Sequence, residues 1–252
     1  MIQVSGLQKT FHDRKKGDVH AVQGVSFTCR PGQVFGLLGR NGAGKTTTLR
    51  MLATILVPTG GTATVAGFDI MEKSAEVRRR IGYLSGETKL YDRLTGRELL
   101  QYFGALAGMT ATAVAARIGE LTERFALTEL LDVRVGKMST GMKQRLSITR
   151  VVFHDPEVMI FDEPTAGLDV IAARSVLALI VDLKRQGRTI IYSTHIMTEA
   201  ERICDEVAII ERGKILAHGS LESIRNQSAS RSLEDVFVEV VTGVGGGSNG
   251  DR

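Results

Sequence analysis

The chain has 252 residues, of which 43% are hydrophobic and 24% are charged, a composition that excludes global disorder and a coiled coil. Its 32 basic and 28 acidic side chains leave a formal charge of +4, an excess too small to indicate a nucleic-acid-binding protein. The longest apolar stretches, such as residues 176–181, are far shorter than the ~20 residues that span a bilayer, and no basic-then-apolar leader opens the chain.

The first third of the chain has the pattern of short strands. Three segments carry Val, Thr and Phe between Gly or Pro residues, as antiparallel strands do: 2–7, 19–28 and 62–67. Residues 33–38 are mostly apolar, which is typical of a buried parallel strand. Residues 45–56 then predict a helix, and Pro58 marks its end.

The middle of the chain is predicted to be helical. No proline occurs between about 92 and 154, and Val114, Ile118, Leu121 and Phe125 recur at spacings of four, three and four. That spacing places the four side chains on one apolar face of a helix. We interpret this stretch as a helical lobe inserted between two parts of an α/β core.

The last third returns to alternating strands and helices. The predicted strands are 158–161, 189–193 and 207–211, and the predicted helices between them are 171–186 and 196–203. Short buried strands that alternate with helices imply a parallel sheet covered on both faces. Residues 211–214 are typical of a tight hairpin turn.

These patterns predict one α/β domain over residues 1–242. We place the core at about 1–88 and 156–220, the helical lobe at about 89–155, and a C-terminal extension at 221–242. Residues 243–252 are rich in Gly, Ser and Asn and are predicted to be a disordered tail. The only two cysteines, Cys29 and Cys204, form neither a metal cage nor a disulfide framework, which suits a reducing cytosol.

Residues 39–46 (GRNGAGKT) match the phosphate-binding pattern G-x-x-x-x-G-K-[ST]. A chance glycine-rich turn is the alternative, but the motif follows an apolar strand and opens a helix. Such a loop turns backbone N–H groups inward around phosphates, and the helix N-terminus favours negative charge. We expect Lys45 to reach the β- and γ-phosphates, Thr46 to bind Mg²⁺ and Thr47 to hold the α-phosphate. The predicted nucleotide-binding residues here are Gly39, Asn41, Gly42, Ala43, Gly44, Lys45, Thr46 and Thr47.

Two adjacent acids end the apolar strand at 158–161. Neighbouring side chains on a strand point to opposite sides, so we expect Asp162 and Glu163 to have different roles. Asp162 would hold Mg²⁺, and Glu163 would orient and deprotonate an attacking water. Surface solvation is the alternative for an isolated acid pair; the phosphate loop in the same chain favours catalysis.

Ser139 stands just before a helical pattern, in Ser139-Thr140-Gly141-Met142. Serine is a good N-cap residue, and capping alone would explain its presence. The N-terminus of a helix also presents free N–H groups, which would bind a γ-phosphate placed nearby.

The order of these motifs resembles the ATP-binding subunit of ABC transporters. The phosphate loop, Ser139 to Met142, Asp162-Glu163, residues 166–169 (AGLD) and residues 193–195 (STH) follow one another as they do in that family, over roughly residues 2–220. The resemblance implies a P-loop NTPase core with an N-terminal antiparallel β subdomain and an inserted α-helical subdomain. It also implies a head-to-tail homodimer that holds two ATP molecules between the phosphate loop of one subunit and the Ser139 segment of the other.

The resemblance assigns roles to further residues. It implies that Ser139 and Gly141 contact the nucleotide across the dimer, that His195 contacts the γ-phosphate and that Asp169 lies in the loop linking the two sites. Alone, His195 would be a helix cap or a satisfied polar residue, and Asp169 an N-cap. Phe11 stands where the family stacks an aromatic ring on adenine, although by itself it suggests a core residue.

Two segments depart from the family pattern. The family signature Leu-Ser-Gly-Gly-Gln becomes Met138 to Met142 here, with Ser139 and Gly141 retained. The Gln that normally binds Mg²⁺ after residues 81–84 is replaced by Gly86, which has no side chain. We hypothesise that Glu87, one residue further on, supplies the missing metal ligand.

Residues 90–95 and 233–237 are similar to the sodium-extrusion and drug-resistance exporter branch of the family. The resemblance therefore implies ATP hydrolysis with Mg²⁺ at the cytoplasmic face of the membrane, coupled to export through a separate permease that docks beside residues 85–95. No nucleic-acid partner is expected. The alternatives are a soluble ABC-type ATPase acting on nucleic acid or ribosomes, a P-loop kinase, and a nucleotide-binding module without turnover.

Overall fold

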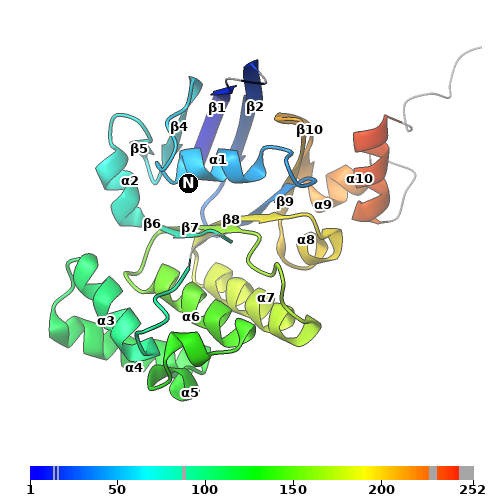
Figure 1. Cartoon of the computed structure of the whole chain (residues 1–252). Coiled ribbons are helices and arrows are strands. Elements are labelled where there is room, and N and C mark those ends of the chain that lie inside the picture. Colours follow the sequence, from blue (N-terminus) through cyan, green and yellow to red (C-terminus); the bar gives the residue numbers. More distant parts are fainter. Residues whose placement is uncertain (14, 16, 87–88, 227–231, 244–252) are drawn as a thin grey trace, which may run out of the picture.

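The computed structural model describes residues 1–13, 15, 17–86, 89–226 and 232–243. Two sheets organise this part of the chain (Figure 1). The first is antiparallel, with the strand order β2-β1-β4-β5. Its strands are β1 (Ile2–Asp13), β2 (Gly17–Cys29), β4 (Gly60–Val65) and β5 (Phe68–Asp69).

The second sheet has six strands in the order β10-β9-β3-β8-β7-β6. All neighbours in it are parallel except β9 and β10, which form a hairpin through Arg212 and Gly213. Both turn residues have positive φ angles, 47° and 77°, as a tight two-residue hairpin requires. The strands are β3 (Val34–Leu38), β6 (Ile81–Leu84), β7 (Val158–Asp162), β8 (Thr189–Thr194), β9 (Glu206–Glu211) and β10 (Lys214–Ser220).

Helices cover both faces of the six-stranded sheet, with α1 on one side and α6 and α7 on the other (Figure 1). The segment between β6 and β7 contains helices and a short 3₁₀ turn, η1 (Val135–Lys137), in its described residues. The helices are α1 (Lys45–Leu52), α2 (Ser74–Arg80), α3 (Gly96–Leu106), α4 (Ala111–Phe125), α5 (Thr128–Leu131), α6 (Thr140–Val152), α7 (Val170–Arg185), α8 (Met197–Ile203), α9 (Leu221–Asn226) and α10 (Leu233–Thr242).

The alternation of side chains along the central strands builds two cores. Val34 and Leu38 of β3 face the cluster shared with the helical segment, whereas Phe35 and Leu37 face the cluster shared with α1 and the antiparallel sheet. The buried residues of α4 are the predicted apolar face, Val114, Ile118, Leu121 and Phe125. The α/β fold class is therefore confirmed, and the division into core, lobe and extension stays a prediction.

Several boundaries differ from those expected. β1 continues to Asp13 rather than residue 7, and β2 begins at Gly17 rather than 19, because their polar ends pair through backbone hydrogen bonds, which leave no apolar alternation in the sequence. α1 ends at Leu52 rather than 56, since Thr54 has a left-handed φ of 59°. Gly243 ends α10 with a left-handed φ of 70°, and residues 244–252 of the expected tail lie outside the described residues.

Both cysteines, Cys29 and Cys204, are free and buried. In the described part of the chain, no helix is long and apolar enough to cross a membrane.

Candidate functional site

Three adjacent strands deliver the candidate residues to one edge of the parallel sheet. β8 lies between β3 and β7, and the register pairs Leu38 with Thr194 and Asp162 with Ser193. The segments that follow these strands are the phosphate loop, His195 and Glu163. Ligands of open α/β sheets bind outside the carboxyl ends of the strands, so this edge is the expected place for a site.

The phosphate loop ends in a helix with an uncapped N-terminus. Gly44, the N-cap of α1, has a φ of 111°, and no side chain caps the helix. A Cβ on Gly44 would lie 2.6 Å from the carbonyl oxygen of Ala21, so only glycine fits there. The pocket in front of the loop has a volume of about 150 Å³ and is lined by loop residues, Ala21 and Glu163. An anion in this pocket would meet free N–H groups and the positive end of the helix dipole.

Lys45 is buried, with 4% of its side chain exposed. Its Nζ donates hydrogen bonds to the carbonyl oxygens of Gly39 (2.7 Å) and Arg40 (3.1 Å) and lies 3.1 Å from Oε1 of Glu163. A buried ammonium group is stable only when it is paired in this way. The loop therefore holds the cation at the pocket, where it would offset the charge of a phosphate.

Asp162 is buried at the end of β7 and accepts hydrogen bonds from the hydroxyls of Ser193 (2.6 Å) and Thr46. Desolvation raises the pKa of this carboxyl, although both hydrogen bonds oppose the shift. A buried carboxylate beside a threonine hydroxyl is a donor set that suits Mg²⁺, because hard cations prefer oxygen ligands and offset the desolvation of the acid. No group of three or more His, Cys, Asp or Glu suited to a metal occurs among the described residues, and Mg²⁺ commonly needs few protein ligands besides water and phosphate.

Strand alternation does not explain why Glu163 and Asp162 have different surroundings, because Glu163 is not part of the strand. It lies just past β7 and has a left-handed φ of 47°, an uncommon conformation for a residue other than glycine. Its N–H donates to the carbonyl oxygen (3.2 Å) and Oγ (3.1 Å) of Ser193, which fixes this turn. The turn aims the carboxylate at Lys45 and at His195, whose Nδ1 lies 3.2 Å from Oε2.

His195 follows β8 and has 45% of its side chain exposed. It lines a second pocket of about 480 Å³ together with Arg40, Asn41 and, from α10, Phe237. The imidazole thus lines the pocket while its Nδ1 contacts Glu163. The structure brings together the phosphate loop, Asp162, Glu163 and His195, all of which the sequence analysis singled out.

Ser139, Gly141 and Asp169 have local roles in the single chain. The Oγ of Ser139 accepts from the N–H of Met142 (3.2 Å) and caps α6. Asp169 caps α7 by accepting from the N–H groups of Ile171 and Ala172, each at 2.9 Å. A Cβ on Gly141 would lie 3.3 Å from that of Ala172, which places the two helix starts side by side. No hydrogen bond or ion pair among the described residues joins Ser139 or Asp169 to the phosphate loop.

Two further predicted residues stand apart from the strand ends. Phe11 lies on β1 with 41% exposed, and the Nζ of Lys9 lies 5.2 Å from its ring centroid. Phe11 is therefore not a core residue, which was the alternative reading, and its stacking on adenine stays a prediction. Glu87 lies outside the described residues. Its neighbour Gly86 is exposed, and a Cβ there would lie 4.0 Å from the carbonyl oxygen of Asp162.

Sequence reasoning missed two residues that tie the site together. The amide nitrogen of Gln144, on α6, donates to the carbonyl oxygen of Pro164, just after Glu163. One oxygen of the buried Glu199 accepts from the hydroxyls of Thr165 (2.9 Å), Tyr192 (2.6 Å) and Thr194 (3.1 Å). Glu199 thereby joins the segment after Glu163 to the strand before His195. The sequence of α8 contains three charged residues in seven, so it held no signal that singled out Glu199.

Comparisons with known proteins agree with this geometry. A family model described as "ABC transporter" matches residues 22–166. The chain is 45% identical over 246 residues to the ABC transporter ATP-binding protein NatA of Bacillus subtilis (strain 168), covering 97% of this chain and all of that protein. It is 39% identical over 236 residues to the Nod factor export ATP-binding protein I of Rhizobium sp. (strain N33), covering 94% and 76%.

A solved structure described as the ATP binding subunit of an ABC transporter has a TM-score of 0.84 and 30% identity, over 95% of this chain and 99% of that one. The family match covers more than half of the chain, and the relative from Bacillus subtilis is matched over its whole length. The chain therefore belongs to the ABC transporter family, and it is similar to the ATP-binding subunits of that family.

Proposed function

We propose that this chain is the peripheral motor of an exporter, in which ATP binding and hydrolysis at the strand-end site drive a separate membrane subunit. The observation that carries the site assignment is the contact of Glu163 with both Lys45 (3.1 Å) and His195 (3.2 Å) in front of the phosphate loop. Glu163, the proposed base for water, thus lies within reach of Lys45, the cation for the phosphates, and of His195, the imidazole for the terminal phosphate.

In this proposal the reaction is in-line attack of water on the γ-phosphorus. Glu163 orients the water and accepts its proton, while Lys45 and His195 offset the charge that develops on the phosphate oxygens. The ammonium of Lys45 exchanges its contact with Glu163 for the nucleotide, which leaves the carboxylate available as the base. Thr47 and the backbone N–H groups of the loop hold the remaining phosphates, and Phe11 stacks on the adenine.

Thr46 and Asp162 would hold Mg²⁺, which supplies charge neutralisation at the phosphates when bound. Their neighbouring oxygens and the raised pKa of Asp162 support this assignment. We keep Glu87 as the proposed third protein group, because Gly86 in the preceding position lies near Asp162 and has no side chain.

We propose a head-to-tail homodimer in which Ser139 of the partner subunit reaches the γ-phosphate held by this chain. Gly141 keeps that helix start free of bulk, and Asp169 links the two sites from the neighbouring helix start. Nucleotide between the two chains favours closure, since it contacts both, and hydrolysis removes those contacts.

The proposed membrane subunit is a separate chain, and this subunit binds it from the cytoplasmic side near residues 85–95. Export is the proposed direction, because the relative from Rhizobium is named for export and the likeness of residues 90–95 and 233–237 points to the same branch.

Product analysis tests the reaction. Purified chain is incubated with Mg²⁺ and γ-labelled ATP, with and without a mixture of small-molecule acceptors, and the label is followed to free phosphate or to a phosphorylated product. Free phosphate, lost in a Lys45→Ala variant, supports an ATPase. Label transferred to an acceptor indicates a kinase, and binding without release of phosphate indicates a module that does not turn over.

A further inference from the structure

The buried acid of α8 has no part in the proposed reaction. Glu199 is 8% exposed. Its Oε2 atom accepts hydrogen bonds from the hydroxyls of Thr165 (2.9 Å), Tyr192 (2.6 Å) and Thr194 (3.1 Å), and these three donors are buried as well. Within the described residues, no ion pair involves Glu199. A buried carboxylate without a cation is costly, so its place among these hydroxyls calls for an explanation.

Glu201, two residues further along the same helix, provides an internal comparison. Its Oε1 atom accepts from Nη2 of Arg225 (2.6 Å), which supplies a counter-charge, and from the N–H of Leu233 (2.8 Å). These contacts join α8 to α9 and α10. The donors of Glu199 belong instead to β8 and to the segment after Glu163. The two acids of α8 thus hold different parts of the molecule: Glu201 holds the C-terminal helices, and Glu199 holds segments that adjoin the site.

The donor Thr194 fixes the backbone on both sides of His195. It is the last residue of β8, and its Oγ1 atom donates to Glu199 and accepts from the N–H of Ile196 (3.0 Å). One hydroxyl therefore joins the residues before and after His195, and Glu199 holds that hydroxyl in place. Because 45% of the His195 side chain is exposed, its orientation depends on this turn and on the contact of Nδ1 with Oε2 of Glu163 (3.2 Å).

The donor Thr165 ties the same carboxylate to the segment that carries Glu163. Thr165 lies two residues past Glu163, and the Glu163 turn is itself held by Ser193. One oxygen of Glu199 therefore joins a fixed turn to the turn at His195. Contacts lead from Glu163 to the imidazole by two routes, directly through Oε2 and indirectly through Glu199.

The third donor, Tyr192, compensates the charge of the acid. Its side chain is fully buried on β8, and burial together with the neighbouring carboxylate raises the pKa of the phenol, which therefore stays protonated and donates. A carboxylate only accepts hydrogen bonds, and bonds to a charged acceptor are stronger than bonds to a neutral one. An amide at position 199 would bring two N–H donors among hydroxyls that already donate toward it, so we expect it to hold the two threonines less firmly.

We infer that Glu199 is a positioning residue that holds the His195 turn against the segment carrying Glu163, and thereby keeps the imidazole in place for the terminal phosphate. The inference rests on the roles of Glu163 and His195 in the proposed function. Glu199 acts through the hydroxyls of Thr194 and Thr165. Among the described residues, no hydrogen bond or ion pair joins it to the phosphate loop, so we expect it to affect turnover and not nucleotide affinity.

Nitrogen NMR of the nucleotide-free full chain with ¹⁵N-labelled histidine tests the geometry without turnover. The nitrogen shifts of an imidazole report where its protons lie, and therefore report the contact of Nδ1 with Glu163. We expect Glu199→Gln and Thr194→Val to move the His195 signals toward those of a solvent-exposed imidazole, whereas Glu201→Gln leaves them unchanged. His195 signals that stay in place in Glu199→Gln overturn the inference, as do equal shifts in Glu201→Gln.

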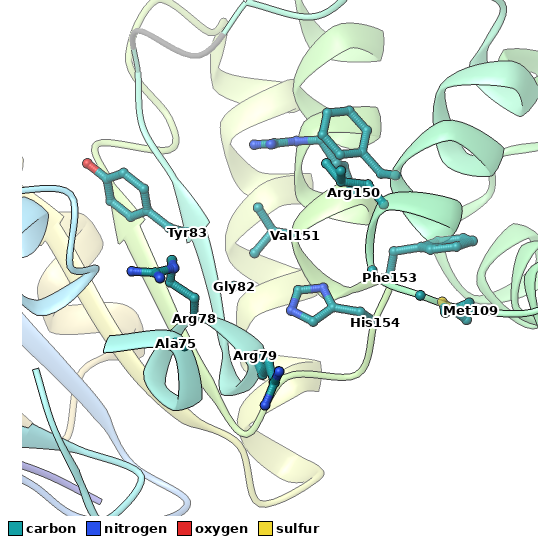
Figure 2. Close-up of a pocket in the computed structure, with 14 residues that line it drawn as sticks. Ala75, Arg78, Arg79, Gly82, Tyr83, Met109, Arg150, Val151, Phe153 and His154 are labelled. Carbon is teal, nitrogen blue, oxygen red and sulfur yellow. The ribbon is translucent and has the colours of Figure 1, made fainter. Parts of the chain in front are cut away.

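His154 is the internal control for that measurement. It lies beside β6 and just past the end of α6, where it lines a pocket of about 760 Å³ (Figure 2). Its Nε2 donates to the carbonyl oxygen of Ile81 (3.0 Å), so a backbone group and not Glu199 fixes this ring. The His154 signals are therefore expected to stay the same in every variant. If they shift together with those of His195, the substitution has disturbed the fold as a whole, and Thr165→Val decides by the same criteria.

Steady-state ATP hydrolysis tests the consequence for turnover. Glu199→Gln is expected to lower kcat about tenfold with less than about a twofold change in KM, because misplacing a group that acts on the transition state leaves ground-state binding intact. Glu201→Gln, the same change on the same helix, is expected to leave both constants within about twofold of those of the unmodified chain. A loss that appears in KM alone, or equally in the two variants, overturns the inference.

A double-mutant cycle with His195→Ala separates positioning from general damage. If Glu199 acts through His195, then Glu199→Gln costs at most about twofold in kcat once the imidazole is gone. A further loss of about tenfold in that background overturns the inference while the proposed function stands. If the unmodified chain releases no phosphate, or His195→Ala retains full turnover, the proposed function fails, and the histidine signals still decide whether Glu199 holds the turn.

Discussion

The strand-end cluster and the Ser139 segment differ in how much of their chemistry one chain completes. Glu163 contacts both Lys45 and His195, which follow neighbouring strands, so one copy assembles this part of the site. Among the described residues, the side chains of Ser139 and Asp169 instead hydrogen-bond to N–H groups of their own helices. The single chain thus assembles the strand-end cluster by itself, whereas in the single chain the Ser139 segment has the role of capping helices.

One side chain can both cap a helix and belong to a ligand-binding site. The helix start at Ser139 is as well capped as that at Thr110, whose Oγ also accepts at 3.2 Å, yet Thr110 belongs to none of the motifs that resemble the family. Capping geometry therefore does not separate the two, and only the effect of substitution on turnover does.

The largest expected effect concerns Glu163. Glu163→Gln keeps the size of the side chain and removes the base, so we expect phosphate release to fall about 10²- to 10⁴-fold while ATP still binds. The variant is also expected to accumulate as an ATP-bound dimer, measured by size-exclusion chromatography with light scattering. A variant that remains monomeric with saturating Mg²⁺ and ATP contradicts the two-chain site.

Asp162→Asn tests the role of the strand-end cluster in turnover. We expect Mg²⁺-dependent turnover to fall on the order of a hundredfold, because the proposed metal loses its charged ligand. In the metal-free chain the same change is expected to raise Tm, since it removes a carboxylate whose charged form is disfavoured by burial.

The rise in Tm expected for Asp162→Asn depends on pH, and the pKa of Asp162 determines the sign of this dependence. The folded-state pKa of Asp162 is raised, so the folded chain holds this proton more tightly than the unfolded chain does. The stability of the unmodified, metal-free chain therefore falls as pH rises above the ordinary Asp range, and Asp162→Asn lacks that part of the decline. Thermal melts between pH 4 and 7 measure it, and equal slopes for both chains refute the assignment.

Ser139→Ala tests whether Ser139 acts in turnover or only caps its helix. We expect about 1 kcal/mol of lost stability from the missing cap and, in addition, about a tenfold loss of turnover. Thr110→Ala is the matched control, expected to lose similar stability with turnover unchanged. If both variants lose stability and neither loses turnover, the segment does not reach the nucleotide.

The smallest expected effect concerns Glu87. Glu87→Ala is expected to lower Mg²⁺-dependent turnover by more than it lowers nucleotide affinity, since the proposed ligand acts through the metal. Phosphate release and nucleotide binding, both titrated with Mg²⁺, measure the two quantities. An unchanged rate removes Glu87 from the site.

Local patterns predicted much of this molecule. The apolar runs at 33–38, 158–161 and 189–193 are strands of the parallel sheet, and the spacing of Val114 to Phe125 marks the buried face of α4, because burial imposes its period on the sequence. Polar pairing in the β1–β2 hairpin left no such period, so its length could not be predicted.

The phosphate loop and its chemistry could be predicted from the amino-acid sequence alone, since a few neighbouring residues encode a glycine-rich turn between strand and helix. The tertiary structure decided which side chains share the pocket. Strand order placed β8, which leads to His195, between the strands that lead to the loop and to Glu163, and the left-handed turn at Glu163, held by Ser193, aimed its carboxylate at Lys45. It also buried the Nε and Nη2 atoms of Arg150 without a hydrogen-bond partner among the described residues, because pairing between residues far apart in sequence depends on packing and not on a local pattern.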